Sequence, residues 1–162
     1  MEDLAWQEKI RGYVDLKMFD EAWAAIESLP PTDRGSPEAQ ELRITILLDR
    51  GDYDDALQLS ETLCDLFPDR HSGFIHGAYC LHARGKTGEA IAFLQSGPVS
   101  LQEEPIYFFN LACYELALGK AEVAMSWLEQ SFEMDPPSRA KALEDPDLEP
   151  LRERILERMR NA

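Results

Sequence analysis

The sequence has no long apolar run, although 44% of its 162 residues are hydrophobic. A membrane-spanning helix needs about 20 consecutive apolar residues, so none is expected. The segment from Met1 to Trp6 has neither the basic start nor the apolar run of a secretory signal, and we expect a cytoplasmic protein. The three cysteines, Cys64, Cys80 and Cys113, cannot all pair within the chain, and free thiols agree with a reducing compartment.

Basic residues are scarce. The chain has 16 Lys and Arg residues and 31 Asp and Glu residues, which gives a net charge of −15. A field of this sign repels phosphate backbones, so nucleic acid is not expected as a partner. The acidic excess belongs mostly to the first half of the chain: residues 35–70 carry nine acidic and three basic side chains, whereas residues 137–162 carry six of each.

Signatures of catalysis and of cofactor binding are missing as well. The segment RGKTGEA at residues 84–90 only superficially resembles a phosphate-binding loop, because the preceding glycine is absent. His71, His76, Cys80 and His82 lie close in sequence, but on a helix His82 is turned by about 120° from Cys80, and His71 precedes the helix. We therefore expect no metal, no cofactor and no enzymatic activity.

Small residues instead recur at a fixed spacing of 34 positions. The recurring residues are Ala22, Ala56, Ala90 and Ala124, together with Gly51, Gly85 and Gly119. Glycine at this place suits a left-handed cap at the end of one helix, and the alanine falls inside the next helix. The clearest unit, Pro105–Pro136, has the helical spacing of apolar residues on both sides of Gly119. Each unit is therefore predicted to be a helical hairpin.

The pattern resembles the tetratricopeptide repeat family, whose motif is W-x2-L-G-x2-Y, then A-x3-F, then P. The last copy matches at Phe108, Leu111, Ala112, Ala124, Leu128 and Pro136, with Glu115 where an aromatic residue is usual. In the first copy, Lys17 stands in place of the turn glycine. The resemblance implies an all-α, right-handed superhelical solenoid in a single domain. Its repeats would span about 3–36, 37–70, 71–104 and 105–138, followed by a capping helix at about 147–160.

Two local departures from the repeat carry predictions of their own. Gly97 and Pro98 should end the second helix of the third copy about one turn early, and a loose connection should follow over residues 97–105. Between the first two copies we expect a turn, with Ser36 capping a helix that begins at Pro37.

After the last copy, a short helix is expected over residues 139–143. Asp147 should then cap a terminal helix with Pro150 in its first turn. The apolar face of that helix would consist of Leu148, Leu151, Ile155 and Met159. A charge-balanced outer face suits the polar end of a solenoid better than a membrane surface.

In the solenoid that the resemblance implies, the first helix of each hairpin lines an inner, concave groove. The groove changes from acidic at its N-terminal end to apolar and aromatic at its C-terminal end. The candidate partner-binding residues are Arg11, Glu38, Glu41, Thr45, Ile75, His76, Tyr79, His82, Ile106, Phe109, Asn110, Cys113 and Leu116.

Two occupants can cover the apolar end at Ile106, Phe109 and Leu116. One is the C-terminal segment of the chain itself, folded back, and the other is a peptide or helix of a partner. Basic groups of a partner would then dock against Glu38, Glu41 and Asp49. Some relatives bind acidic tails through a basic clamp, but the matching positions here are Gln7, Arg11, Leu42, Ser72 and His76, so that clamp is effectively absent.

The sequence thus favours a non-enzymatic protein–protein interaction module, either monomeric or weakly self-associating. One alternative is a structural protein that self-associates through its apolar C-terminal end. Another, by resemblance alone, is a bacterial secretion chaperone, because small acidic tetratricopeptide proteins serve that role.

Overall fold

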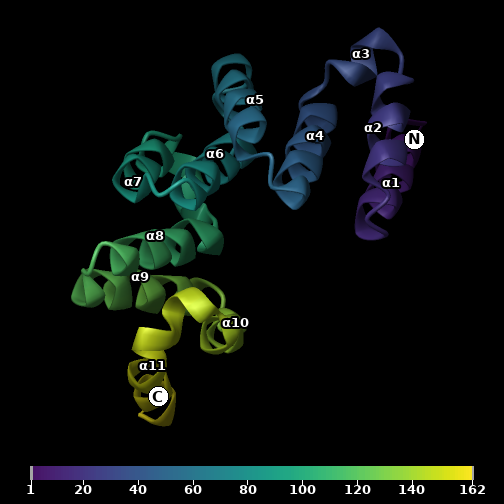
Figure 1. Cartoon of the computed structure of the whole chain (residues 1–162). Coiled ribbons are helices and arrows are strands. Elements are labelled where there is room, and N and C mark those ends of the chain that lie inside the picture. Colours follow the sequence, from purple (N-terminus) through teal and green to yellow (C-terminus); the bar gives the residue numbers. More distant parts are fainter. Residues whose placement is uncertain (1, 162) are drawn as a thin grey trace.

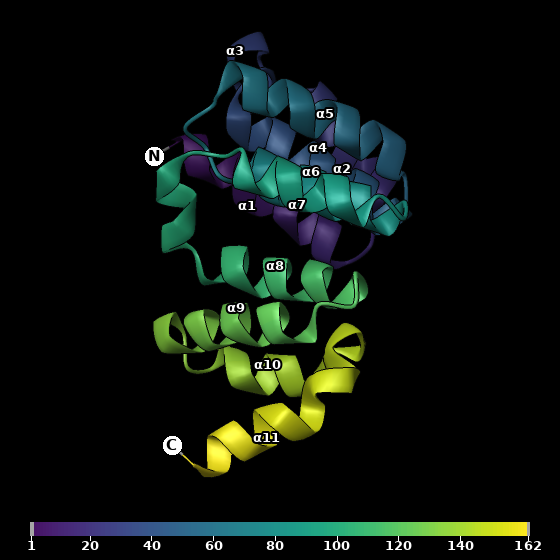
Figure 2. The same ribbon diagram turned by 90° about the vertical axis from the view of Figure 1, so that its left-hand side faces the viewer.

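The computed structural model describes residues 2–161, which form eleven α-helices and two short 3-10 helices without any strand. Figures 1 and 2 show these helices as hairpins stacked into a curved array, with the two termini at its opposite ends. The architecture is an all-α helical solenoid, as predicted.

Four successive pairs of helices pack as hairpins. The pairs are α1 (Glu2–Asp15) with α2 (Phe19–Glu27), α4 (Pro37–Arg50) with α5 (Tyr53–Leu66), α6 (Ser72–Ala83) with α7 (Thr87–Gln95), and α8 (Pro105–Ala117) with α9 (Ala121–Met134). The second helices begin at Phe19, Tyr53, Thr87 and Ala121, so they keep the 34-residue period of the alanines. Each of those alanines is fully buried, since a methyl group is all that fits between closely packed helices.

The turn inside each hairpin has a left-handed residue at the predicted position. Gly51, Gly85 and Gly119 have φ angles of 79°, 79° and 81°. Lys17 takes the equivalent place in the first hairpin with φ of 60°. The conformation is therefore set by the turn and is imposed even on a residue that has a side chain.

Other local predictions are confirmed with one addition. The hydroxyl of Ser36 accepts a hydrogen bond from the amide of Ala39, so it caps α4 as predicted. Helix α7 ends at Gln95, one residue before the Ser96 cap and close to Gly97. The addition is that short helices occupy the segments expected to be irregular: α3 (Pro31–Arg34) and the 3-10 helix η1 (Val99–Glu103). Leu101 of η1 is fully buried, which ties this segment to the core.

The two halves of the array share their helix boundaries. Helices α2 and α7, and likewise α5 and α9, have the same lengths and start two repeat periods apart. Helices α4 and α8 both start at a proline, and the short elements α3 and η1 lie at matching places. Each half is therefore a pair of hairpins of the same design, and positions in one half can be compared directly with those in the other.

The C-terminal segment differs from the prediction at its start. The expected short helix is present as α10 (Ser138–Glu144), but Asp147 does not cap the terminal helix. The carboxylate of Asp145 accepts from the amide of Asp147 and starts a 3-10 helix, η2 (Pro146–Leu151); α11 (Arg152–Arg160) begins only after it. The physical reason is that Pro146 suits the first position after a cap, and Pro150 then falls where an α-helix would need its missing N–H.

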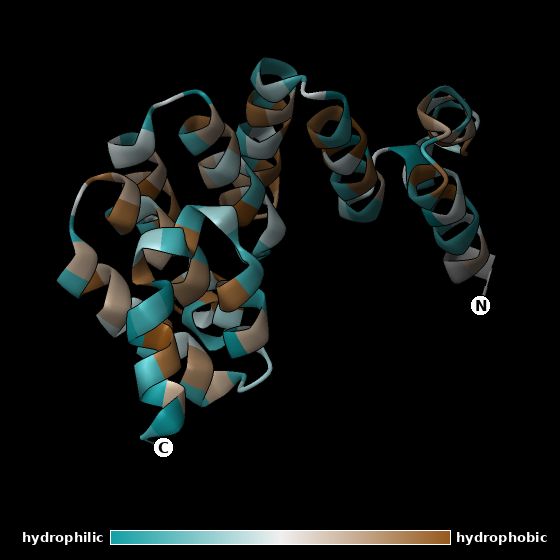
Figure 3. Cartoon of the chain, turned by 60° about the horizontal axis from the view of Figure 1, so that its bottom comes forward, coloured by the Kyte–Doolittle hydropathy of each residue, from teal (hydrophilic) through white to brown (hydrophobic). Residues whose placement is uncertain are grey.

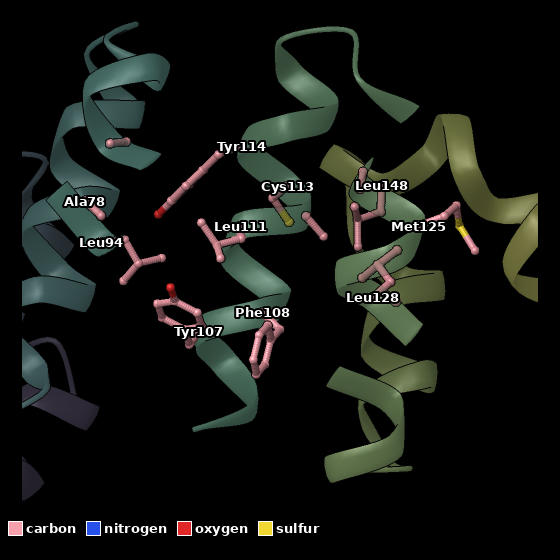
Figure 4. Close-up of a cluster of buried hydrophobic side chains, with 14 of the residues drawn as sticks. Ala78, Leu94, Tyr107, Phe108, Leu111, Cys113, Tyr114, Met125, Leu128 and Leu148 are labelled. Carbon is pink, nitrogen blue, oxygen red and sulfur yellow. The ribbon is translucent and has the colours of Figure 1, made fainter. Parts of the chain in front are cut away.

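The largest core runs through the second half. Figure 4 shows side chains of α8 between Ala78 and Leu94 on one side and Met125, Leu128 and Leu148 on the other. From the C-terminal segment, Leu148, Leu151 and Ile155 are buried as predicted, whereas Met159 is 43% exposed. Figure 3 shows hydrophilic residues alternating with hydrophobic ones along the helix at the C-terminus. The C-terminal segment thus packs Leu148, Leu151 and Ile155 into the core of the second half.

Candidate functional site

The acidic residues at the start of α4 are paired within the chain. Nε of Arg70 lies 3.0 Å from a carboxylate oxygen of Glu41, and Nη1 of Arg70 lies 3.2 Å from one of Glu38. The hydroxyl of Ser72 donates a hydrogen bond of 2.7 Å to the same Glu41 oxygen. The hydrogen bond that Arg70 donates to Glu41 is the largest cause of its raised pKa, so the arginine stays charged. This part of the groove therefore offers a partner less free negative charge than the sequence indicates.

The candidate residues on α6 fall into two groups. Tyr79 is 45% exposed, and its ring meets that of Tyr53 edge to face, with centroids 6.3 Å apart. The ring of His82, in contrast, packs against that of Tyr114 on α8, with centroids 4.8 Å apart. Its Nδ1 also shares a 3.0 Å hydrogen bond with the hydroxyl of Thr87. Tyr79 is thus presented to solvent, whereas His82 joins α6 to α8.

Ile75 and His76 are both half-buried on α6. Ile75 packs against the main core. Burial lowers the pKa of His76 below its ordinary value, and the carboxylate of Glu41 opposes part of that shift. His76 is therefore neutral at pH 7 and contributes no positive charge to the groove there.

Three candidate residues come together in one pocket at the start of α8. The pocket has a volume of about 390 Å³ and lies between α8, the end of α9 and α10. Ile106, which is 46% exposed, lines it together with Phe109 and Asn110. The remaining lining residues are Glu104, Pro105, Ser131, Asp135, Ser138, Lys141 and Asp145. The site therefore combines apolar walls with charged groups.

The C-terminal segment covers the other end of α8. Cys113 is 8% exposed and belongs to the same core cluster as Leu148, toward which Figure 4 shows it. Burial raises the pKa of the Cys113 thiol to about 12, and the carboxylates of Asp145 and Asp147 add to the shift. Leu116 is half-buried against this cluster. The C-terminal segment of the chain thus covers Cys113 and leaves Ile106 accessible.

The other candidate residues do not line this pocket. Arg11 is exposed on α1, and the hydroxyl of Thr45 donates to the backbone carbonyl of Glu41 within α4. Asp49 lies 3.6 Å from the ammonium group of Lys17. Sequence reasoning also missed the charged wall of the pocket, because Lys141 and Asp145 belong to a segment whose fold over α8 no local pattern reveals.

No group of three or more His, Cys, Asp or Glu residues within residues 2–161 is arranged to hold a metal ion. None of the helices described is long and apolar enough to cross a membrane.

The hairpins, the left-handed turns and the buried alanines define the fold class: the chain has the fold of tetratricopeptide repeat proteins. No family model matches the sequence, and no curated protein matches it. Similar folds occur among solved structures. One of them is TTC0263, a thermophilic TPR protein of Thermus thermophilus. It is 17% identical with a TM-score of 0.74, and the match covers 96% of this chain and 97% of that one.

The descriptions of two other similar structures mention a chaperone. The type III secretion translocator chaperone SycD of Yersinia enterocolitica is 23% identical with a TM-score of 0.60, covering 81% of this chain and 91% of that one. PcrH, solved in complex with the chaperone binding region of PopB, is 23% identical with a TM-score of 0.56, covering 79% and 95%. At these identities the similarity establishes the fold alone.

Proposed function

We propose that this chain is a protein–protein interaction module that binds a peptide or a helix of a partner protein along the faces of α6 and α8. The observation that carries the proposal is the open pocket at the start of α8, where Ile106 and Phe109 remain accessible although the C-terminal segment covers Cys113 further along that helix. Exposed apolar side chains around a concavity are typical of recognition sites.

The organisation that serves this role is one domain. We take the four hairpins to be repeats at about 3–36, 37–70, 71–104 and 105–138, with α10, η2 and α11 as the cap. A rigid array of this kind presents side chains from successive helices at fixed distances, and such an extended surface suits a partner segment.

The candidate anchors are Tyr79 and Phe109. An aromatic side chain with a polar tip, such as Tyr79, contributes much contact area at low entropic cost and is common among binding hot spots. To test this, peptides selected from a random display library are titrated by calorimetry. Replacing either residue by alanine should weaken binding by more than about 1 kcal/mol, and Gln58→Ala on the exposed face of α5 should not. Failure to select any binding peptide would remove the proposed function.

A secretion-type chaperone is the second candidate, and the favouring observation is the structural similarity to SycD and to PcrH with its bound PopB region. Copurification of an unfolded export substrate with the chain, and its loss after Phe109→Ala, would distinguish this role from binding to folded partners.

Self-association is a third candidate, but Leu148, Leu151 and Ile155 are buried within the chain, so the C-terminal segment offers a second copy less apolar surface, with Met159 43% exposed. Sedimentation at micromolar concentration tests it, because a mass independent of concentration at the monomer value excludes it.

A further inference from the structure

The pocket on α8 has a counterpart in the first half of the chain. Two repeat periods before Ile106 and Phe109 stand Glu38 and Glu41, at the same places on α4. Two periods before Ser138, which follows α9, stands Arg70, which follows α5. The two halves therefore contain the same site with different residues.

In the first half the side chain of Arg70 lies over this position, and a cavity of about 340 Å³ remains beside it, lined by Glu41, Asp69, Arg70, His71 and Ser72. The guanidinium of Arg70 extends over α4 and pairs with Glu38 and Glu41. In the second half the hydroxyl of Ser138 turns back and donates a 2.7 Å hydrogen bond to the carbonyl of Asp135. Within the described residues 2–161, Ile106 lines an open pocket and is 46% exposed.

The walls specify what can take that place. Ile106 and Phe109 replace two carboxylates, so the floor favours an apolar group where the first half holds a cation. At about 390 Å³ the pocket is near the lower end of the roughly 300–1,000 Å³ that is usual for ligand pockets, which suits one or two side chains better than a whole helix.

The rim has an excess of negative charge. Glu104, Asp135 and Asp145 line it against the single cation Lys141. One oxygen of Glu104 also lies 3.1 Å from Nδ1 of His71. A cation beside the apolar group would therefore meet at least two carboxylates that have no close cationic partner among the lining residues.

We propose that this pocket takes one bulky apolar side chain of a partner peptide, leucine, isoleucine, methionine or phenylalanine, with a lysine or arginine next to it that pairs with the acidic rim. The proposal rests on the interaction function above and specifies its partner. The apolar group occupies the volume over Ile106, and the neighbouring cation reaches Asp145 or Asp135.

The test combines selection with two matched pairs of variants. Twelve-residue peptides are selected from a random display library against the full chain, and the enriched ones are titrated by calorimetry. Ile106→Glu restores the first-half residue type in the pocket; Val123→Glu on α9 introduces the same charge at a residue of similar exposure, 41% against 46%. Lys141→Gln removes the cation of the rim, and Lys86→Gln makes the same change of net charge at an exposed residue outside the pocket.

We expect the enriched peptides to share an apolar residue within two positions of a lysine or arginine. Ile106→Glu should weaken the binding of these peptides more than tenfold, because a carboxylate in the pocket would be desolvated. Val123→Glu should have little effect on their binding. Lys141→Gln should tighten binding two- to fivefold relative to Lys86→Gln at low salt. If peptides bind but Ile106→Glu acts no more strongly than Val123→Glu, or if the shared residues are acidic, this inference is wrong while the interaction function stands. If no peptide is enriched, both fail.

Discussion

Lys17 has the same left-handed backbone conformation as Gly51, one repeat period further along the chain, with φ of 60° and 79° respectively. The hydrogen bonds match too: the amides of residues 17 and 18 donate to the carbonyls of Val14 and Tyr13, as those of residues 51 and 52 do to Leu48 and Leu47. The same turn thus forms at a lysine, although its Cβ disfavours the left-handed conformation.

Replacing Lys17 should separate the backbone cost from the side-chain contacts. Lys17→Gly and Lys17→Ala both lose the 3.6 Å ion pair with Asp49, but only glycine relieves the left-handed strain. We expect the glycine variant to be more stable than the alanine variant by about 1 kcal/mol in chemical denaturation. As the reverse control, Gly85→Ala should lose a similar amount, because a Cβ there meets nothing within 4 Å and only the conformation resists it. Equal stability of the two Lys17 variants would contradict this account.

Gly73 lies where α6 packs tightly against α5. A Cβ at Gly73 would lie 3.1 Å from the backbone carbonyl oxygen of Ser60 and 2.8 Å from Sγ of Cys64. Because the carbonyl cannot move without moving α5, Gly73→Ala should cost about 1–3 kcal/mol. Gly88 is at the same second position of its helix with open space around it, so Gly88→Ala should gain up to about 1 kcal/mol. Urea denaturation of both variants measures this, and a neutral Gly73→Ala would show that the helices can separate freely.

Arg70 joins α4 to the start of α6 through two carboxylates. We expect Arg70→Ala to lower the free energy of unfolding by about 1 kcal/mol, which is the upper part of the range for partly exposed ion pairs. Arg158 makes a single ion pair, with Glu129 at 2.8 Å, and this pair is more exposed. Arg158→Ala should therefore cost less than about 0.5 kcal/mol. The loss of unfolding free energy in Arg70→Ala should be smaller in 1 M salt, because salt screens the ion pairs. An equal cost for the two variants would mean that the network adds nothing beyond a single pair.

His76 should make stability depend on pH. Burial lowers its pKa in the folded state below the ordinary value of about 6.5, so the unfolded chain binds the proton first as the pH falls. The free energy of unfolding should therefore decrease as the pH drops below about 6.5. In His76→Gln this decrease should be smaller, measured by denaturation at pH 7.5 and 5.5 with His71 and His82 unchanged. A larger decrease in the variant would reverse the sign and contradict the assignment.

The repeat register could be predicted from the sequence because it depends on local requirements. Ala90 must be small where helices cross, Gly119 must allow positive φ, and Ser36 must cap a helix that begins with proline; each requirement acts within a few residues. The start of the terminal helix was missed because Asp145 and Asp147 are both good caps, and only the position of Pro150 relative to the chosen cap decides between them.

The pocket could not be predicted because it depends on which side chains reach from one helix to another. Arg70 reaches Glu38 over a separation of 32 positions, and Ser138 does not reach Ile106; neither side-chain direction is visible in the sequence. The apolar character of Ile106 and Phe109 was visible in the sequence, and both residues line the pocket. How much of that helix the C-terminal segment leaves open follows only from the packing of α10 and η2.

The central claim is that a partner segment binds over Ile106 and Phe109, and photo-crosslinking measures the position of the bound segment most directly. The photo-reactive residue p-benzoylphenylalanine is introduced in place of Phe109, or in place of Gln58 on the exposed face of α5, and each protein is irradiated with a selected peptide. The account predicts a peptide adduct from position 109 and none from position 58. An adduct from position 58 alone, with peptide affinity unchanged in both proteins, would contradict it.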